Sequence, residues 1–261
     1  MAQHLADGSV IQFLVVVLCL ALIAAYVHAA LLSNRSYRKW PIYRTILWIF
    51  ALLMIAFSVG GFGIAGRSHA FTDHMWIHLI LGMAAPLLAV LAAPMTLLLR
   101  TLPVAAARKV SHFLKSPLPV FISHPVTAGI LNTGGMFVLY RSGLYSLMDT
   151  APLLNGLIHL HLFMAGYLFT AAILCIDPSP HRVSYLARAI LLILSLAAHG
   201  ILSKMIYAFP PDGITLADAQ SAGKLMYYGG DLVDAFLIGL FCWKWYNAAR
   251  PRQLLKEIGE K

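Results

Sequence analysis

The segment TDHMWIHLILGMAAPLLAVLAAPMTLLLR, residues 72–100, decides the fold class. It is largely apolar after its first turn, and it exceeds the roughly 20 apolar residues that a helix needs to cross a bilayer. Yet it opens with Asp73, His74 and His78. Residues four apart share one face of a helix, so the two histidines point the same way. The segment therefore predicts a membrane helix with a polar group at its outer end.

The rest of the chain has the composition of an integral membrane protein. Of its 261 residues, 60% are hydrophobic and 11% are charged, whereas soluble domains carry roughly 25% charged residues. Seven apolar segments are separated by short loops, and their approximate ranges are 10–32, 42–65, 74–99, 121–140, 153–175, 186–208 and 222–243. We predict an all-α polytopic membrane protein, a bundle of seven transmembrane helices. Residues 1–247 form this domain, and residues 248–261 form a short basic cytoplasmic tail.

The basic residues predict how the bundle is oriented. Most of the 19 Lys and Arg residues fall in alternate loops and in the tail, which places the N-terminus outside and the C-terminus in the cytoplasm. The net charge of +9 is therefore a topology signal.

The sequence has no basic stripe interleaved with aromatic residues, so it does not indicate nucleic-acid binding. The first segment lacks a basic start and a small-residue cleavage site, so we expect a retained helix. The three cysteines form no CxxC motif and predict no thiolate metal site.

Ionisable side chains inside the predicted spans mark a candidate site, because such groups are costly in a bilayer. One group of them falls in the outer half of the membrane, so packed helices can gather these side chains around one outward-facing cavity; they are His78, His159, His161, His199, Lys204, Asp231 and Asp234. His159 and His161 point in nearly opposite directions, and we favour His159, which shares a face with Asn155. Tyr227 lies on one helical stripe with Lys224 and the two aspartates.

The pair His74 and His78 favours a metal, since two imidazoles at this spacing reach one point beside the helix. Methionines lie near the same level, and thioethers suit Cu(I). Structural interpretations stay open beside this one. Lys204 can pair with an aspartate to link two helices, and a lone buried histidine such as His28 or His161 can donate a hydrogen bond between helices.

Three motifs carry a resemblance to a known family. The first is DHMWIHLILGMAAPLLAVLAAPMTLLLR, an H-M-x-x-H segment followed by an apolar run with two prolines. The second is LLNGLIHLHLFMAGYLF, with His159 seven residues before Gly166. The third is LADAQSAGKLMYYGG, a D-x-Q-x-A-G-x-x-M pattern. From about residue 40 to 247 the chain resembles the CtaG-type cytochrome c oxidase assembly factors, bacterial seven-helix membrane proteins. It departs from them at Asn155, where many members have His, and at Tyr227, where Trp is usual.

The resemblance implies a multi-pass protein of the bacterial cytoplasmic membrane that helps to mature a haem–copper oxidase. Copper is the expected cargo, and the expected partners are an oxidase subunit and membrane lipid, without nucleic acid. The expected ligand set is Asp73, His74, His78, His159, His199 and Met226. The residues expected to orient ligands or relay protons are Asn155, Lys204, Tyr227, Asp231 and Asp234. No bond is made or broken in a substrate, so the prediction is that the protein is not an enzyme.

Three rival functions remain open at this stage. The same His, Lys and Asp cluster suits a proton- or metal-coupled transporter, although no charged residue continues the path into the inner half. A haem-binding redox protein would use His78 and His159 as axial ligands. The cluster can also serve only to hold the helices together.

Overall fold

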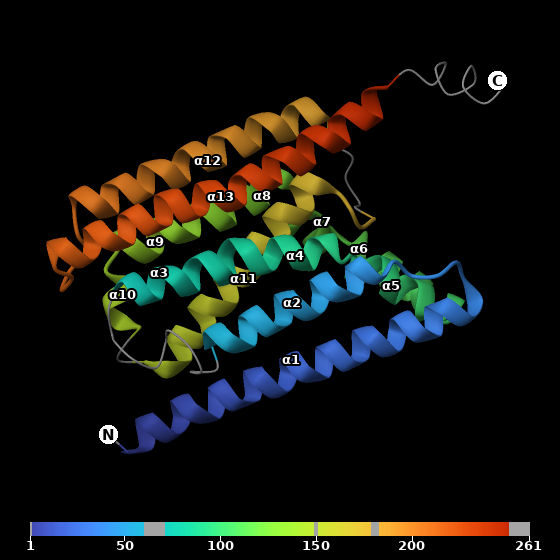
Figure 1. The fold of residues 1–261 in the computed structure, drawn as a ribbon, viewed down its shortest axis with the longest axis horizontal. Coiled ribbons are helices and arrows are strands. Elements are labelled where there is room, and N and C mark those ends of the chain that lie inside the picture. The colour runs from blue at the N-terminus through green and yellow to red at the C-terminus, as the bar shows by residue number, and fades with distance from the viewer. Residues whose placement is uncertain (1, 60–70, 149–150, 179–182, 251–261) are drawn as a thin grey trace.

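Every regular element is helical in the residues described by the computed structural model, which are 2–59, 71–148, 151–178 and 183–250 (Figure 1). The helices in chain order are α1 Ala2–Ser36, α2 Ile42–Val59, α3 Phe71–Leu79, η2 Ile80–Ala84, α4 Ala85–Leu91, α5 Pro94–Thr101, α6 Val104–Leu114, α7 Pro117–Ile122, α8 Pro125–Gly129, η3 Ile130–Gly134, α9 Gly135–Arg141, α10 Leu144–Leu147, α11 Pro152–Leu174, α12 Tyr185–Ala208 and α13 Leu216–Ala249. The two η elements are π-helical turns. The all-α prediction is confirmed.

The polytopic prediction is also confirmed. Six helices in the described ranges are long and apolar enough to cross a membrane, namely Val10–Ser36, Ile42–Val59, Phe71–Leu91, Pro152–Leu174, Tyr185–Ala208 and Leu216–Ala249. The predicted fourth span falls on the shorter helical run formed by α8, η3 and α9. The seventh span and the orientation therefore stay predictions. Residues 60–65 of the predicted second span, and residues 251–261 of the predicted tail, lie outside the described residues.

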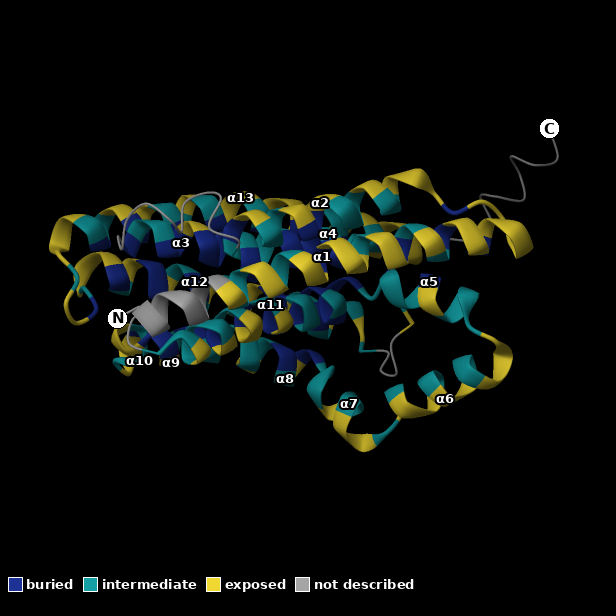
Figure 2. Ribbon diagram, turned by 90° about the horizontal axis from the view of Figure 1, so that it is seen from below, coloured by how far each residue is buried: buried dark blue, intermediate teal, exposed yellow. Residues whose placement is uncertain are grey.

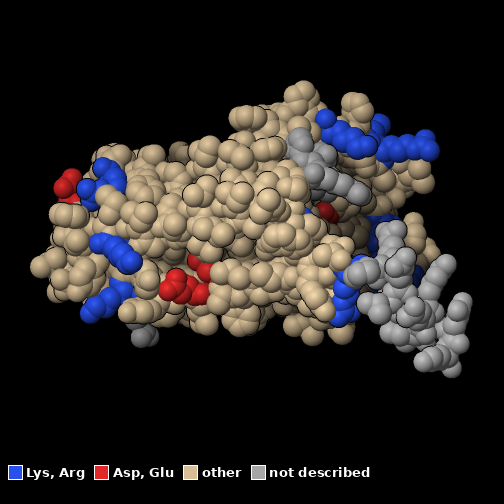
Figure 3. Space-filling view, turned by 90° about the horizontal axis from the view of Figure 1, so that it is seen from above, with Lys and Arg blue, Asp and Glu red and all other residues tan. Residues whose placement is uncertain are grey.

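The run from α3 through η2 to α4 lies at the centre of the bundle. It is the most buried of the six candidate spans, and it contacts α2, α11 and α13. The N-terminal helix α1 lies along the outside of α2 (Figure 1) and is mostly exposed (Figure 2). Lys and Arg gather toward the two ends of the molecule, with a largely uncharged flank between them (Figure 3). The segment that opens with two histidines is thus the core of the fold.

Two prolines shape this central run. Pro86 lies in the first turn of α4, just after η2, and its missing N–H cannot bond to the carbonyl four residues earlier, that of Gly82. The second proline, Pro94, begins α5, and Ala93 before it adopts a left-handed conformation with φ of 52°. The predicted span 74–99 therefore ends at Leu91 and turns sharply instead of continuing.

Candidate functional site

Three buried histidines and one half-buried histidine, from three helices, form a row that we call the imidazole row. It consists of His159, His74, His78 and His199. The ring centres of His74 on α3 and His159 on α11 are 5.9 Å apart, and those of His78 on α3 and His199 on α12 are 6.1 Å apart. The exposed fractions of His74, His78 and His199 are 9%, 1% and 6%. The fold thus brings together the four histidines that the sequence predicted as ligands.

Several ring nitrogens of the row have no hydrogen-bond partner among the residues that the structure describes. Nδ1 of His159 donates to the backbone carbonyl of Asn155 at 3.0 Å, which leaves Nε2 with its lone pair free. That Nε2, Nε2 of His199 and both ring nitrogens of His78 are buried and unpartnered. A buried polar atom without a partner is costly. These nitrogens are therefore placed to bind a ligand.

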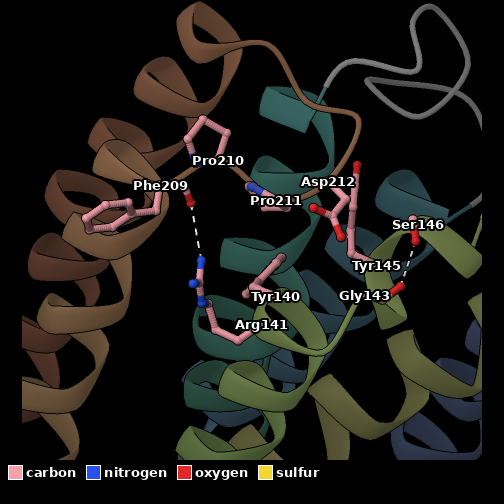
Figure 4. Close-up of a pocket in the computed structure, with 9 residues that line it drawn as sticks. All are labelled: Tyr140, Arg141, Gly143, Tyr145, Ser146, Phe209, Pro210, Pro211 and Asp212. Carbon is pink, nitrogen blue, oxygen red and sulfur yellow. Dashed lines mark hydrogen bonds between the residues drawn. The ribbon is translucent and has the colours of Figure 1, made fainter.

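The row meets two tyrosines at His74. The Tyr140 hydroxyl lies 3.1 Å from Nε2 of His74, and the Tyr145 ring centre lies 4.9 Å from that of His74. Both tyrosines also line a hollow of about 160 Å³ between α9, α10 and the loop after α12 (Figure 4). Arg141 closes one side of it by donating to the carbonyl of Phe209 at 3.3 Å. A ligand can approach the row from this hollow.

At His78 and His199 the row meets a small cavity of about 30 Å³, which the sequence did not predict. Its lining includes His78, His199, Asn132, Thr133, Ser195 and Asp234. Residues of both π-helical turns, η2 and η3, border it. Such turns occur often at functional sites, because an extra residue per turn reorients the side chains. Asn132, which interrupts the fourth apolar segment, was the available signal.

The remaining predicted ligands lie in different surroundings. Asp73 is half-buried in the first turn of α3. Met226 is fully buried in an apolar cluster with Phe71 and Met75. Within the described ranges, no three His, Cys, Asp or Glu side chains are arranged to hold one metal ion. The row offers imidazoles in pairs, and metal binding stays a prediction.

The predicted orienting residues do not form one inward-facing stripe. The ammonium of Lys204 lies 5.2 Å from the ring centre of Tyr227, and no ion pair joins it to Asp231 or Asp234 in the described part of the chain. Asp231 is exposed, whereas Asp234 is 9% exposed and lines the cavity. Asn155 contributes its backbone carbonyl, not its side-chain amide, to His159.

His161 lies apart from the row, as its spacing from His159 predicts. Its Nε2 lies 3.2 Å from the carbonyl of Leu131, and its ring packs against Gly135, where an added Cβ would lie 2.4 Å from Nε2. It therefore links α11 to the run of α8, η3 and α9.

Comparison with known proteins places the chain in a family. The model of the cytochrome c oxidase caa3 assembly factor family matches residues 24–248, which include the imidazole row and both ends of its surroundings. The chain belongs to this family.

Two mycobacterial proteins are similar to this chain. An uncharacterized protein of Mycobacterium bovis is 33% identical over 173 residues, which cover 64% of this chain and 26% of that protein. One of Mycobacterium leprae is 30% identical over 227 residues, which cover 84% of this chain and 32% of that protein. The chain thus spans about a third or less of the length of these curated relatives. No solved structure matches it.

Residues of the second and third motifs position the histidines of the row. The Asp218 carboxylate accepts hydrogen bonds from the backbone N–H groups of Phe71 and Thr72 at 2.8 and 3.2 Å, and so fixes the first turn of α3. Gly166 lets α11 touch η2, since an added Cβ would lie 2.1 Å from the carbonyl oxygen of Gly82. The sequence marked both residues through the resemblance, but it did not reveal these contacts.

Proposed function

We propose that this assembly factor carries copper in its imidazole row and delivers it to an oxidase subunit on the outer side of the membrane. The observation that carries the proposal is the set of buried, unpartnered ring nitrogens on His78, His159 and His199. Imidazole nitrogen is a good ligand for copper, and no bond of a substrate has to be made or broken. The role is therefore assembly and not catalysis.

The spacing of the histidines suits an ion held by two imidazoles at a time. When an ion lies on the line between two imidazoles and each metal–nitrogen bond is about 2 Å long, the two ring centres are roughly 6 Å apart. The two contacts in the row measure 5.9 and 6.1 Å. A site with few ligands holds its ion less tightly than a closed cage of three or four. This property suits a protein that must release copper to a partner.

The hollow at Tyr140 and Tyr145 supplies the route by which copper reaches the row. Arg141 and Asp212 lie at its rim, where the ion is still hydrated. Beyond the tyrosines the surroundings are buried, and His74 is the first imidazole that an ion meets. Asp73, in the same turn of α3, is placed to balance the charge of the ion. Met226 is a further possible ligand, because its thioether is soft.

The test is the copper content of the detergent-purified protein, loaded under reducing and then under oxidising conditions. We expect stoichiometric copper in the wild type and its loss in a His78→Ala, His159→Ala double variant that still unfolds cooperatively. His161→Ala is the matched control, because His161 lies on the same helix as His159 but outside the row. Equal copper in the wild type and the double variant, or none in the wild type, would refute copper carriage by the row.

A further inference from the structure

The exposed carboxylate of Asp231 has no role in the row as described. Lys224 and Lys244 lie on the same helix, about 20 residues apart, which is roughly the span of a hydrocarbon core. Asp231 falls between them, on the flank of the bundle. Acidic atoms are visible part-way along this otherwise uncharged flank (Figure 3). No hydrogen bond or ion pair to Asp231 occurs within the described ranges. A charged group facing lipid is costly, so this position calls for a partner.

The face of α13 that carries Asp231 has the features of a helix-docking surface. Asp231, Ala235 and Gly239 follow one another at intervals of four residues and are all exposed, so they form one stripe. A Cβ added at Gly239 would meet nothing within 4 Å. Small residues four apart let two membrane helices approach closely. Leu232 and Phe236, which are 63% and 64% exposed, stand beside the stripe. We call this stripe the Asp231 face.

The Asp231 face adjoins the inner end of the imidazole row. Asp231 directly follows Gly230, against which the His199 ring packs; Nε2 of this ring is unpartnered among the described residues, and His199 is 6% exposed. Asp234, one turn further along α13, lines the small cavity together with His78 and His199. Polar groups thus continue from the row, through the cavity, to the flank of the bundle.

We propose that the Asp231 face docks a transmembrane helix of the protein that receives the copper, and that this helix presents a basic side chain to Asp231. The proposal rests on the proposed function for the identity of the recipient, an oxidase subunit. Charge complementarity selects the helix, since an Arg or Lys opposite Asp231 neutralises both groups in the bilayer. Ala235 and Gly239 have small side chains and let the docked helix approach α13 closely. The ion then leaves the row sideways, past Asp234, into a ligand set on the docked subunit.

The test is photocrosslinking in membranes that contain the full chain and its oxidase. A photoreactive residue, p-benzoylphenylalanine, replaces Leu232 beside the face or, as the control, Leu160, which is 57% exposed on α11. We expect a covalent adduct with an oxidase subunit from position 232 and none from position 160. Gly239→Leu, which fills the approach, and Asp231→Asn, which removes the charge, should each reduce this adduct at least tenfold. Gly239→Leu should leave copper binding in detergent unchanged.

The outcomes separate this proposal from the proposed function. Adducts of equal yield from both positions, an adduct only with a second copy of this chain, or no adduct at position 232 while the oxidase still acquires its copper would each overturn docking at the Asp231 face. A position-232 adduct that depends on Asp231 and Gly239 supports docking even if the purified chain retains no copper. In that case copper carriage fails and the docking surface stands.

Discussion

The carboxylate of Asp218 on α13 accepts a hydrogen bond from the backbone N–H of Phe71, with a nitrogen–oxygen distance of 2.8 Å. It thereby satisfies a free N–H of the first turn of α3, the helix that carries His74 and His78. Asp218→Ala leaves this donor and that of Thr72 without an acceptor. We expect the free energy of unfolding to fall by about 1–3 kcal/mol, with weaker copper retention. Thermal unfolding in detergent and copper stoichiometry measure both.

The control for this prediction is Asp212→Ala, which removes an exposed carboxylate from the loop between α12 and α13. It should change the midpoint of thermal unfolding little, because exposed substitutions away from such contacts cost within about 0.5 kcal/mol. If both variants unfold at the same temperature, the Asp218 contact does not stabilise α3.

Gly166 on α11 and Gly82 in η2 bring the backbones of these two elements into contact. One added methyl group at position 166 should therefore lower the stability of the protein strongly. A Cβ at position 166 would lie 2.1 Å from the carbonyl oxygen of Gly82. Neither backbone can move without shifting a helix. Gly166→Ala should therefore destabilise the protein by about 1–3 kcal/mol or more, as overpacking does, measured by denaturation in detergent. Gly156→Ala on the same helix meets open space and should be neutral or stabilising by up to about 1 kcal/mol. A Gly166→Ala variant as stable as Gly156→Ala would contradict the close contact.

The hydroxyl of Tyr140 competes with any ligand for Nε2 of His74, from which it lies 3.1 Å. Tyr140→Phe removes this competitor. Since one such hydrogen bond contributes about 1 kcal/mol, copper should bind about fivefold more tightly, while the fold loses a similar amount of stability. Competition against a copper chelator of known affinity measures the change. Tyr207→Phe, at an exposed tyrosine of α12, is the control. Weaker binding in Tyr140→Phe would mean that the hydroxyl supports the ion instead of competing with it.

The contribution of sequence reasoning differs between the histidines and the acidic residues. The spacing of four placed His74 and His78 on one face, and the spacing of two separated His159 from His161. Both predictions depend only on the geometry of a single helix, and the structure agrees with both. The convergence of the four histidines depends on how the spans pack against one another. Residue spacing within one helix does not encode that packing. Residue spacing also does not encode the two π-helical turns, which arise where the helical hydrogen-bond pattern becomes irregular near Pro86 and near Asn132.

The acidic residues show why rotation of a helix is hard to predict. Asp231 and Asp234 are separated by roughly 60° around the helix axis, so one stripe can hold both. In the folded bundle Asp234 faces the cavity and Asp231 faces outward. Gly230 sets this rotation, because only a residue without a Cβ lets α13 lie directly against the His199 ring. A polar pattern alone gives no sign of that contact.

Gly230 provides the last prediction, which tests whether His199 belongs to the binding row. A Cβ at position 230 would lie 2.5 Å from Cε1 of the His199 ring, so in Gly230→Ala the ring must move and its 6.1 Å pairing with His78 must change. A ring can rotate more easily than a backbone can shift, so the fold should persist. Copper affinity should fall by about tenfold, as it does when a residue that orients a ligand is altered. Gly239→Ala carries the same helix-propensity gain in open space and should bind copper like the wild type. Unchanged affinity in Gly230→Ala would assign copper to His74, His78 and His159 without His199.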